Sequence, residues 1–159
     1  MGMYMTFVRL TPAELTKAVN DPEWAEEFVD EFYEDDDIDP LADLDLEKSW
    51  GGLIYLSDEA GLGLSLLDSG TRIISDDTCI DGWDADEVKA TAKALSETPF
   101  SKLVAHYNPA AMMSQEVYPR VWDADPEGEL ESLEWNYRQM VEFFTAAAAA
   151  NHAVLMSWG

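Results

Sequence analysis

Residues 127–158, EGELESLEWNYRQMVEFFTAAAAANHAVLMSW, decide the fold class of this chain. Between residues 130 and 144, apolar side chains recur every three or four positions, which predicts a long amphipathic helix. Five consecutive alanines at 146–150 favour the helix further, because alanine has the highest helix propensity. Asn151 is a plausible stop, and residues 153–158 have the composition of a closing strand. A long helix that leads directly into a strand indicates an α+β fold.

In the part of the chain before residue 127, capping residues and prolines mark the starts of several predicted helices. Residues 3–10 match a first strand, and Thr11-Pro12 and Asp21-Pro22 each place a capping residue before a proline, which predicts two successive helices. Asp84 opens another helix by the same logic, and the prolines at 99 and 109 begin two shorter ones. We therefore expect helices at 12–19, 22–33, 85–95, 100–107, 109–113 and 127–150.

Extended segments are harder to assign in the middle of the chain. Residues 44–56 fit either a helix or a strand, because Gly51 and Gly52 each weaken a helix by about 1 kcal/mol relative to alanine. Residues 64–67 and 72–75 read as short strands between glycines. We interpret Asp81-Gly82-Trp83 as a turn that anchors a large aromatic side chain in the core.

One domain fits the length of 159 residues, which suffices to bury a substantial core. With neither an internal repeat nor a long linker, we predict a single compact α+β domain over residues 1–159. A small mixed or antiparallel sheet is packed by several helices, including the long C-terminal one. Six Trp, six Tyr and six Phe argue against disorder.

The cellular compartment is predicted from cysteine and hydropathy. Cys79 is the single cysteine, so no internal disulfide can form, and a reducing environment is indicated. The N-terminal segment has neither the charged flank nor the apolar stretch of a secretory signal. No run approaches the roughly 20 apolar residues of a membrane span, and we expect a cytoplasmic protein without membrane contact.

Acidic residues dominate the charge. There are 33 acids and 9 bases, giving a net charge of −24, which disfavours direct binding to nucleic acid or anionic lipid. Fourteen of the acids and no base lie between Lys17 and Lys48. Such a stretch is either a solvated face that maintains solubility or a docking surface for a basic protein. The predicted acidic interaction face comprises Glu27, Asp30, Glu31, Glu34, Asp35, Asp36, Asp37 and Asp39.

Residues 123–134 match the spacing of a calcium-binding EF-hand loop. Asp123, Asp125, Glu127 and Glu134 occupy positions 1, 3, 5 and 12, and Gly128 occupies position 6. The alternative interpretation is the acidic first turn of the long helix, where acids complement the helix dipole.

Catalytic signatures are absent from the sequence. Cys79, His106 and His152 lie in no nucleophile motif, and Gly61-Leu62-Gly63 lacks the third glycine of a nucleotide-binding loop. We therefore predict no cofactor and lean towards a protein without enzyme activity. The alternative of a small-molecule-binding domain or hydrolase would need an aromatic-lined cleft. Its candidate residues are Trp50, His106, Tyr118, Pro119, Arg120 and Trp122.

A series of short motifs in order along the chain resembles the YfbM-like family of bacterial proteins, a domain of unknown function. The motifs are Met1-Gly2-Met3, the segment 46–53 (LEKSWGGL), the helix that begins near Asp86, residues 107–112 (YNPAAM), residues 117–122 (VYPRVW) and the final long helix. The resemblance implies a compact α+β fold and supplies no activity. It marks Trp50, Tyr118, Pro119 and Trp122 as positions where the family pattern is kept.

Three functional hypotheses follow from these observations. The first is an acidic interaction protein, of the inhibitor or immunity type, whose face centred on residues 21–47 binds a basic protein partner. The second is the cleft near Trp50, His106, Tyr118 and Arg120. The third is calcium binding at residues 123–134. The oligomeric state is left open.

Overall fold

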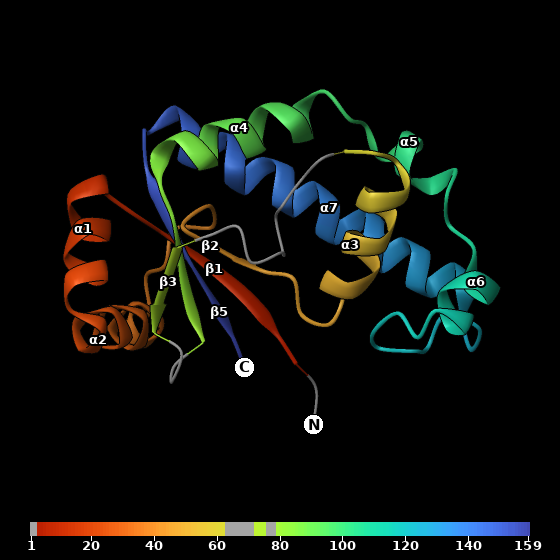
Figure 1. The fold of residues 1–159 in the computed structure, drawn as a ribbon, viewed down its shortest axis with the longest axis horizontal. Coiled ribbons are helices and arrows are strands. Elements are labelled where there is room, and N and C mark those ends of the chain that lie inside the picture. Colours follow the sequence, from red (N-terminus) through yellow and green to blue (C-terminus); the bar gives the residue numbers. More distant parts are fainter. Residues whose placement is uncertain (1–2, 63–71, 76–78) are drawn as a thin grey trace.

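The computed structural model describes residues 3–62, 72–75 and 79–159. Five strands form one antiparallel sheet: β1 (Met5–Leu10), β2 (Asp43–Asp45), β3 (Arg72–Ser75), β4 (Ile80–Trp83) and β5 (Ala153–Trp158). Their order across the sheet is β2-β1-β5-β4-β3 (Figure 1). The last strand of the chain therefore lies in the middle of the sheet, paired with β1 on one side and with β4 on the other.

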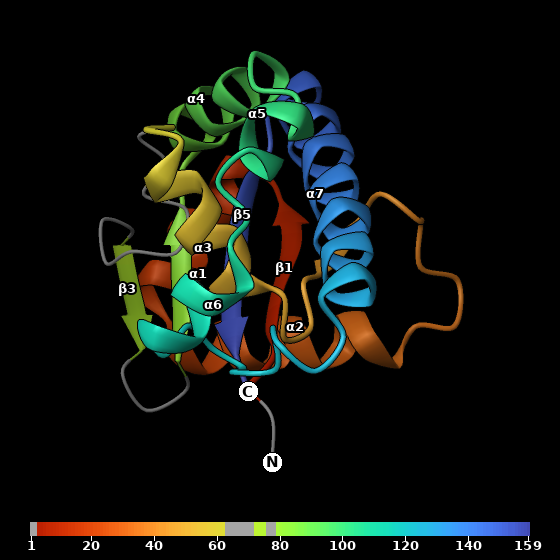
Figure 2. The same ribbon diagram turned by 90° about the vertical axis from the view of Figure 1, so that its right-hand side faces the viewer.

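Helices cover both faces of the sheet. On one face lie α1 (Pro12–Asn20) and α2 (Pro22–Glu34). On the other face lie α3 (Trp50–Glu59), α4 (Ala85–Ser96) and the long α7 (Pro126–Ala149), and Figure 2 shows α7 running past β1 and β5. Two short helices, α5 (Phe100–Val104) and α6 (Pro109–Ser114), connect α4 to α7.

Successive side chains of the central strands point to opposite faces of the sheet and contribute to two separate hydrophobic cores. Met5 and Phe7 of β1 join the larger core under α3, α4 and α7, while Val8 and Leu10 join the smaller core under α1 and α2. This follows from the period of two along a strand, by which successive side chains point to opposite faces. Rings of Phe7, Trp83 and Phe144 pack edge to face or tilted at the centre of the larger core.

The observed fold confirms the predicted α+β class and the long C-terminal helix. Capping explains why the helix starts were predictable. Thr11 and Glu14 form a complete capping box, and Asp21, Asp84 and Asp125 each accept a hydrogen bond from the first turn of the helix that follows.

Two strands differ from the sequence-based interpretation. Residues 80–83 form β4 and not a turn, because they pair with β3 on one side and with β5 on the other. Gly82 leaves room for the smaller core, since a Cβ atom there would lie 2.8 Å from Leu15. The segment 44–56 is divided between β2 and α3 by the loop at residues 46–49. The predicted strand at 64–67 lies outside the described residues, and 72–75 is β3.

Among the helices in the described part of the chain, none is both long and apolar enough to cross a membrane.

Candidate functional site

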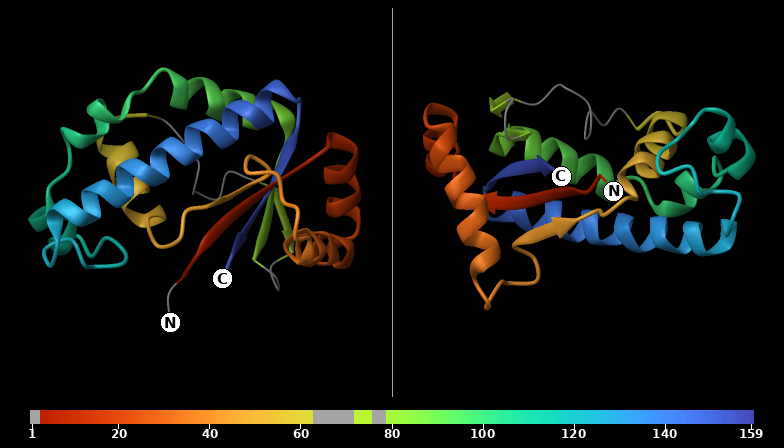
Figure 3. Two further views of the ribbon diagram at one scale, coloured as in Figure 1. Left: turned by 180° about the vertical axis from the view of Figure 1, so that it is seen from behind. Right: turned by 90° about the horizontal axis from the view of Figure 1, so that it is seen from below.

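The base-free acidic stretch begins with α2 on one face of the sheet and ends at β2, an edge strand. Figure 3, seen from below, shows α2 crossing the end of the sheet and the following loop returning to β2. The exposed acids of α2 include Glu27, Asp30, Glu31 and Glu34, and the loop acids at 35, 36, 37 and 39 are exposed as well. All eight residues of the predicted acidic interaction face therefore reach solvent.

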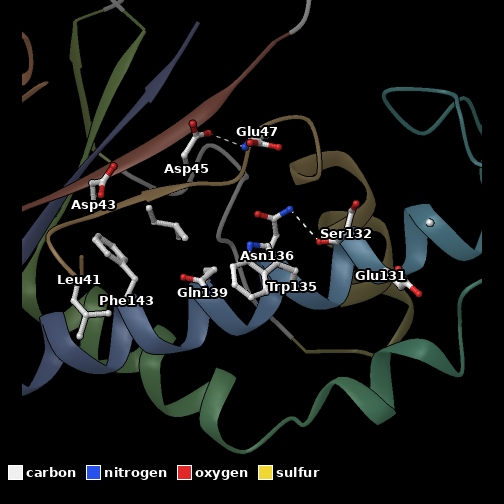
Figure 4. Close-up of a pocket in the computed structure, with 12 residues that line it drawn as sticks. Leu41, Asp43, Asp45, Glu47, Glu131, Ser132, Trp135, Asn136, Gln139 and Phe143 are labelled. Carbon is white, nitrogen blue, oxygen red and sulfur yellow. Dashed lines mark hydrogen bonds between the residues drawn. The ribbon is translucent and has the colours of Figure 1, made fainter. Parts of the chain in front are cut away.

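A groove of about 530 Å³ lies beside this edge, between β2 and α7 (Figure 4). Asp43, Leu44, Asp45 and Glu47 line it from the β2 side. Glu131, Ser132, Trp135, Asn136, Gln139 and Phe143 line it from α7, together with Gly128 and with Leu41 of the loop. Of these described lining residues, four are acids and none is basic.

Among the described strands, none pairs with the outer edge of β2. The backbone N–H of Leu46 donates to Met5 and the N–H of Arg9 donates to Ala42, and Leu44 lies opposite Phe7. Residues 42, 44 and 46 thus turn their peptide groups towards β1. In an antiparallel ladder the alternate residues, Asp43 and Asp45, then turn their peptide groups outwards, and β2 is an edge strand.

Both aspartates of β2 share one face of the sheet. They lie opposite Val8 and Thr6, whose face is covered by α1 and α2. Burial raises the pKa of Asp43 above its usual value, and the nearby Asp45 carboxylate raises it further. Hydrogen bonding with its own backbone opposes this shift. Asp45 in turn accepts from the N–H of Glu47 at 2.8 Å.

Tyr33 of α2 extends this acidic environment. Its side chain is 42% exposed overall, yet burial of the hydroxyl end raises its pKa to about 12. A hydrogen bond with Thr6 opposes the shift, and the charges of Asp43 and Asp45 add to it. The raised pKa values of Tyr33 and Asp43 therefore both include repulsion from neighbouring carboxylates of β2.

An aromatic ring and an amide complete the groove on the α7 side. Trp135 is 62% exposed, the largest exposed fraction among the described large apolar side chains that reach solvent. Asn136 is buried, and its amide nitrogen donates to Ser49 at 2.8 Å and to the Ser132 carbonyl at 3.0 Å. Its side-chain oxygen accepts no hydrogen bond from the described residues, and Figure 4 shows the side chain pointing from α7 towards β2.

The predicted aromatic residues are brought together only in part. Trp50 stacks on Tyr118 with ring centroids 4.9 Å apart, and it meets Trp158 edge to face at 5.1 Å. The Trp50 indole donates to the Met3 carbonyl at 3.0 Å, and the Tyr118 hydroxyl accepts from the Met3 N–H at 2.7 Å. These contacts fasten the segment before β1, so the stack serves as a structural hub.

Pro119 and Trp122 border a smaller pocket of about 330 Å³, together with Tyr4, Lys48 and Glu129. The Trp122 ring is buried, and its indole N–H donates to the Val117 carbonyl at 2.9 Å. This pocket is next to the groove, because Glu47 and Ser132 line both.

His106 and Arg120 do not join the aromatic cluster. His106 is exposed and borders a different pocket, beside Gly61 just after the end of α3. Trp50 begins α3, so about 15 Å of helix separates the two sites. The Arg120 guanidinium turns to solvent, 3.3 Å from Glu116. The cleft of Trp50, His106, Tyr118 and Arg120 is therefore not assembled.

Residues 123–134 do not form an EF-hand loop. The helix α7 begins at Pro126, so Glu127 and Glu134 are helical, and Asp125 caps the helix by accepting from Gly128. Glu134 forms an ion pair with Arg138 at 2.8 Å. Asp123 and Asp125 are exposed, and within the described ranges no three acids, histidines or cysteines could hold a metal ion together. The structure supports the acidic first turn of a helix.

Comparison with known proteins places the fold. A family model described as a domain of unknown function, DUF1877, matches residues 1–157. The chain belongs to the DUF1877 family. No curated protein sequence matches it. Among solved structures, the chain is similar to YfbM of Escherichia coli, a protein of unknown function. The two structures have a TM-score of 0.71 and 12% sequence identity, and the alignment covers 98% of this chain and 99% of that one. At this identity the similarity shows the fold, and it agrees with the resemblance to the YfbM-like family.

Sequence reasoning missed the groove of this DUF1877 chain. It included Asp43, Asp45 and Glu47 in the base-free stretch without singling them out, and it did not consider Trp135 or Asn136. One signal was available: Trp135 falls outside the apolar helical spacing of Leu133, Tyr137 and Met140, between acids at 131 and 142. A tryptophan on the polar face of an amphipathic helix indicates a contact surface.

Proposed function

We propose that the chain is a non-enzymatic, acidic interaction protein of the inhibitor or immunity type, whose β2 edge binds a basic protein partner. One observation carries the proposal. The fourteen acids between Lys17 and Lys48 are Asp21 and those of α2, the following loop, β2 and residue 47, and the acids of β2 and residue 47 line a groove without a basic lining residue.

Charge complementarity at such an edge acts mainly on the encounter. A clustered negative field raises the association rate of a basic partner and rejects acidic ones. An interface also needs a desolvated centre, since exposed ion pairs contribute little affinity. Trp135 and Leu41, at 62% and 38% exposed, supply apolar area beside the acids. The combination of an acidic rim and an exposed tryptophan therefore fits protein binding better than simple solubility.

Solubility alone is the competing explanation. Acidic surfaces keep proteins dispersed without binding anything, and that role has no preference for one edge of the molecule. Under this explanation, neutralising acids on the β2 edge and elsewhere would have the same small effect.

The test is capture of a partner from the native lysate at low and at physiological salt, with identification by mass spectrometry. The bait variant replaces Glu27, Asp30, Glu31 and Glu34 by their amides. The matched control replaces four exposed acids outside the stretch, Asp58, Glu97, Glu116 and Glu142. We expect the wild type and the control to retain the same basic protein, and the α2 variant to lose it. Recovery of no basic partner at either salt, or equal loss in both variants, would contradict the proposal.

A further inference from the structure

We propose that the groove between β2 and α7 is a binding site for an extended basic segment, which adds to the sheet as a strand beside β2 and packs against Trp135. This inference rests on the proposed function and specifies how the partner is held. Its chemical class is a peptide strand with arginine or lysine at alternate positions.

The backbone of β2 provides the first part of the site. Asp43 and Asp45 turn their peptide groups to the outer edge of β2, where no described strand pairs with them. Addition of a strand to such an edge is a common mode of peptide recognition, in which main-chain hydrogen bonds provide affinity and alternate side chains provide specificity.

Side-chain spacing selects basic residues on one face of the added strand. Residues two apart in a strand lie about 7 Å apart on the same face. Asp43 and Asp45 are such a pair, and Tyr33 and the α2 acids lie on their side of the sheet. Arginine or lysine at positions i and i+2 of the segment would lie opposite these aspartates, where opposite-charge pairs stabilise an antiparallel pairing.

The intervening side chain of the segment faces α7. There Trp135 offers an exposed ring, and the side-chain oxygen of Asn136, a residue only 6% exposed, has no donor from the described chain. A tryptophan face attracts cations and packs against aliphatic groups, and an amide oxygen that solvent reaches accepts from an N–H or a guanidinium. The charged groups among the described lining residues are all carboxylates, so the groove favours a cationic segment.

A second copy of the chain is a poor occupant of this edge. Two acidic edges would bring like charges opposite each other, which is the device by which edge strands avoid pairing with copies of themselves. The same two aspartates thus exclude self-association and admit a basic strand.

The experiment measures binding of a synthetic peptide, acetyl-Thr-Arg-Val-Arg-Val-Arg-Thr-amide, by calorimetry or fluorescence anisotropy at 50 and 150 mM salt. A second peptide of the same sequence carries N-methyl groups on alternate residues, so that it keeps the charge and loses the strand-pairing donors. If the segment adds to β2, the methylated peptide binds at least about tenfold more weakly, since it loses more than one hydrogen bond.

Matched variants of the protein locate the site. Asp45→Asn and Asp36→Asn remove the same charge from the same stretch, but only Asp45 lines the groove. Glu131→Gln and Glu142→Gln form the corresponding pair on α7. We expect Asp45→Asn and Glu131→Gln to weaken peptide binding about threefold, and the controls Asp36→Asn and Glu142→Gln to weaken it by less than half of that factor. Trp135→Ala should weaken binding about tenfold, and Trp135→Phe should recover part of this loss. Thermal melts check that each variant is folded.

The inference is overturned if the wild type does not bind the peptide, if the methylated peptide binds equally well, or if groove and control variants behave alike. These outcomes are separable from failure of the proposed function. A captured native partner that binds the Asp45→Asn and Trp135→Ala variants as well as the wild type removes the groove and leaves the acidic interaction protein. Absence of any captured partner removes the function itself.

Discussion

At the scale of single residues, the charged carboxylate of Asp43, at the edge of the sheet, lowers the stability of the folded protein. Its raised pKa means that the charged carboxylate is less favourable in the folded protein than in the unfolded chain. As the pH rises from the usual aspartate range through the raised pKa, the folded state holds more protons than the unfolded state. The contribution of this group to stability therefore falls with rising pH and is lowest at neutral pH.

We expect Asp43→Asn to raise the melting temperature at pH 7, because it removes this cost. Solvent screening at a half-buried site limits the gain to less than about 1 kcal/mol, or up to about 3 °C. The difference should vanish near pH 3, where the wild-type carboxyl is neutral. Melts from pH 3 to 7 measure it, with Asp36→Asn as the control for net charge. If Asp43→Asn melted below the control Asp36→Asn at pH 7, the charged Asp43 carboxylate would not be destabilising.

Gly51 and Gly52 lower the helix propensity of α3, yet the close packing around this helix requires glycine at both positions. Gly52 lowers the helix propensity of α3, yet a Cβ atom there would lie 2.7 Å from Leu133 and against the Trp122 ring. A Cβ atom on Gly51 would collide with the carbonyl oxygen of Tyr118. These close approaches involve residues more than 60 positions away, so the sequence around Gly51 and Gly52 indicates only a weakened helix.

At the scale of elements, the cap formed by Asp125 fixes the start of α7, and the acids around it stabilise that helix terminus. Asp125 accepts from the Gly128 N–H at 3.2 Å, and two acids in the first turn complement the helix dipole. Nearby, burial first and then the Asp125 charge raise the pKa of Glu129. The acids of this segment therefore act on the helix terminus, and their spacing coincides with that of a calcium loop.

Asp125→Ala should destabilise the protein by about 1 kcal/mol through loss of the cap, which lowers the melting temperature by about 2–4 °C. Asp123→Ala, which removes the same charge from an exposed position outside the helix, should have a much smaller effect. Melts with and without millimolar calcium should coincide for all three proteins. A calcium-dependent rise that Asp125→Ala abolishes would instead indicate a metal site.

Helices with local start signals were predictable from sequence, whereas β4, which is held extended by its neighbouring strands, was not. The helices α1, α2, α4 and α7 begin at a polar cap, and three of them continue with proline at the first helical position. In contrast, β4 contains an Asp-Gly pair that is typical of turns, and it is extended because it pairs with β3 and β5 on both sides. The same holds for the site: the acidic stretch is local in sequence, while the groove needs α7 beside β2.

At the scale of the whole molecule, a net charge of −24 opposes compaction. The ion pairs Glu116–Arg120 and Glu134–Arg138 each join residues four apart on the surface, and the 33 acids far outnumber the 9 bases that could pair with them. Long-range repulsion between these charges is screened by salt. The Debye length shortens from about 30 Å at 0.01 M to about 10 Å at 0.1 M.

We therefore expect the melting temperature to rise with sodium chloride over this range and to level off above it. Differential scanning fluorimetry at fixed pH and protein concentration measures the rise. The quadruple amide variant of α2 should start higher at low salt and respond less to salt than the wild type. A melting temperature that is independent of salt, or that falls, would show that repulsion within the acidic edge does not limit stability.

The position of β5 between β1 and β4 has a consequence for how the protein is made. During synthesis the helices on both faces leave the ribosome before residues 153–158 do, and until then β1 and β4 have no common neighbour. Closure of the sheet thus joins segments about 150 positions apart, which is a high contact order and slows folding. Until β5 is synthesised, the nascent chain must hold apolar helix faces without a complete sheet, and its dense negative charge keeps such chains apart during that wait.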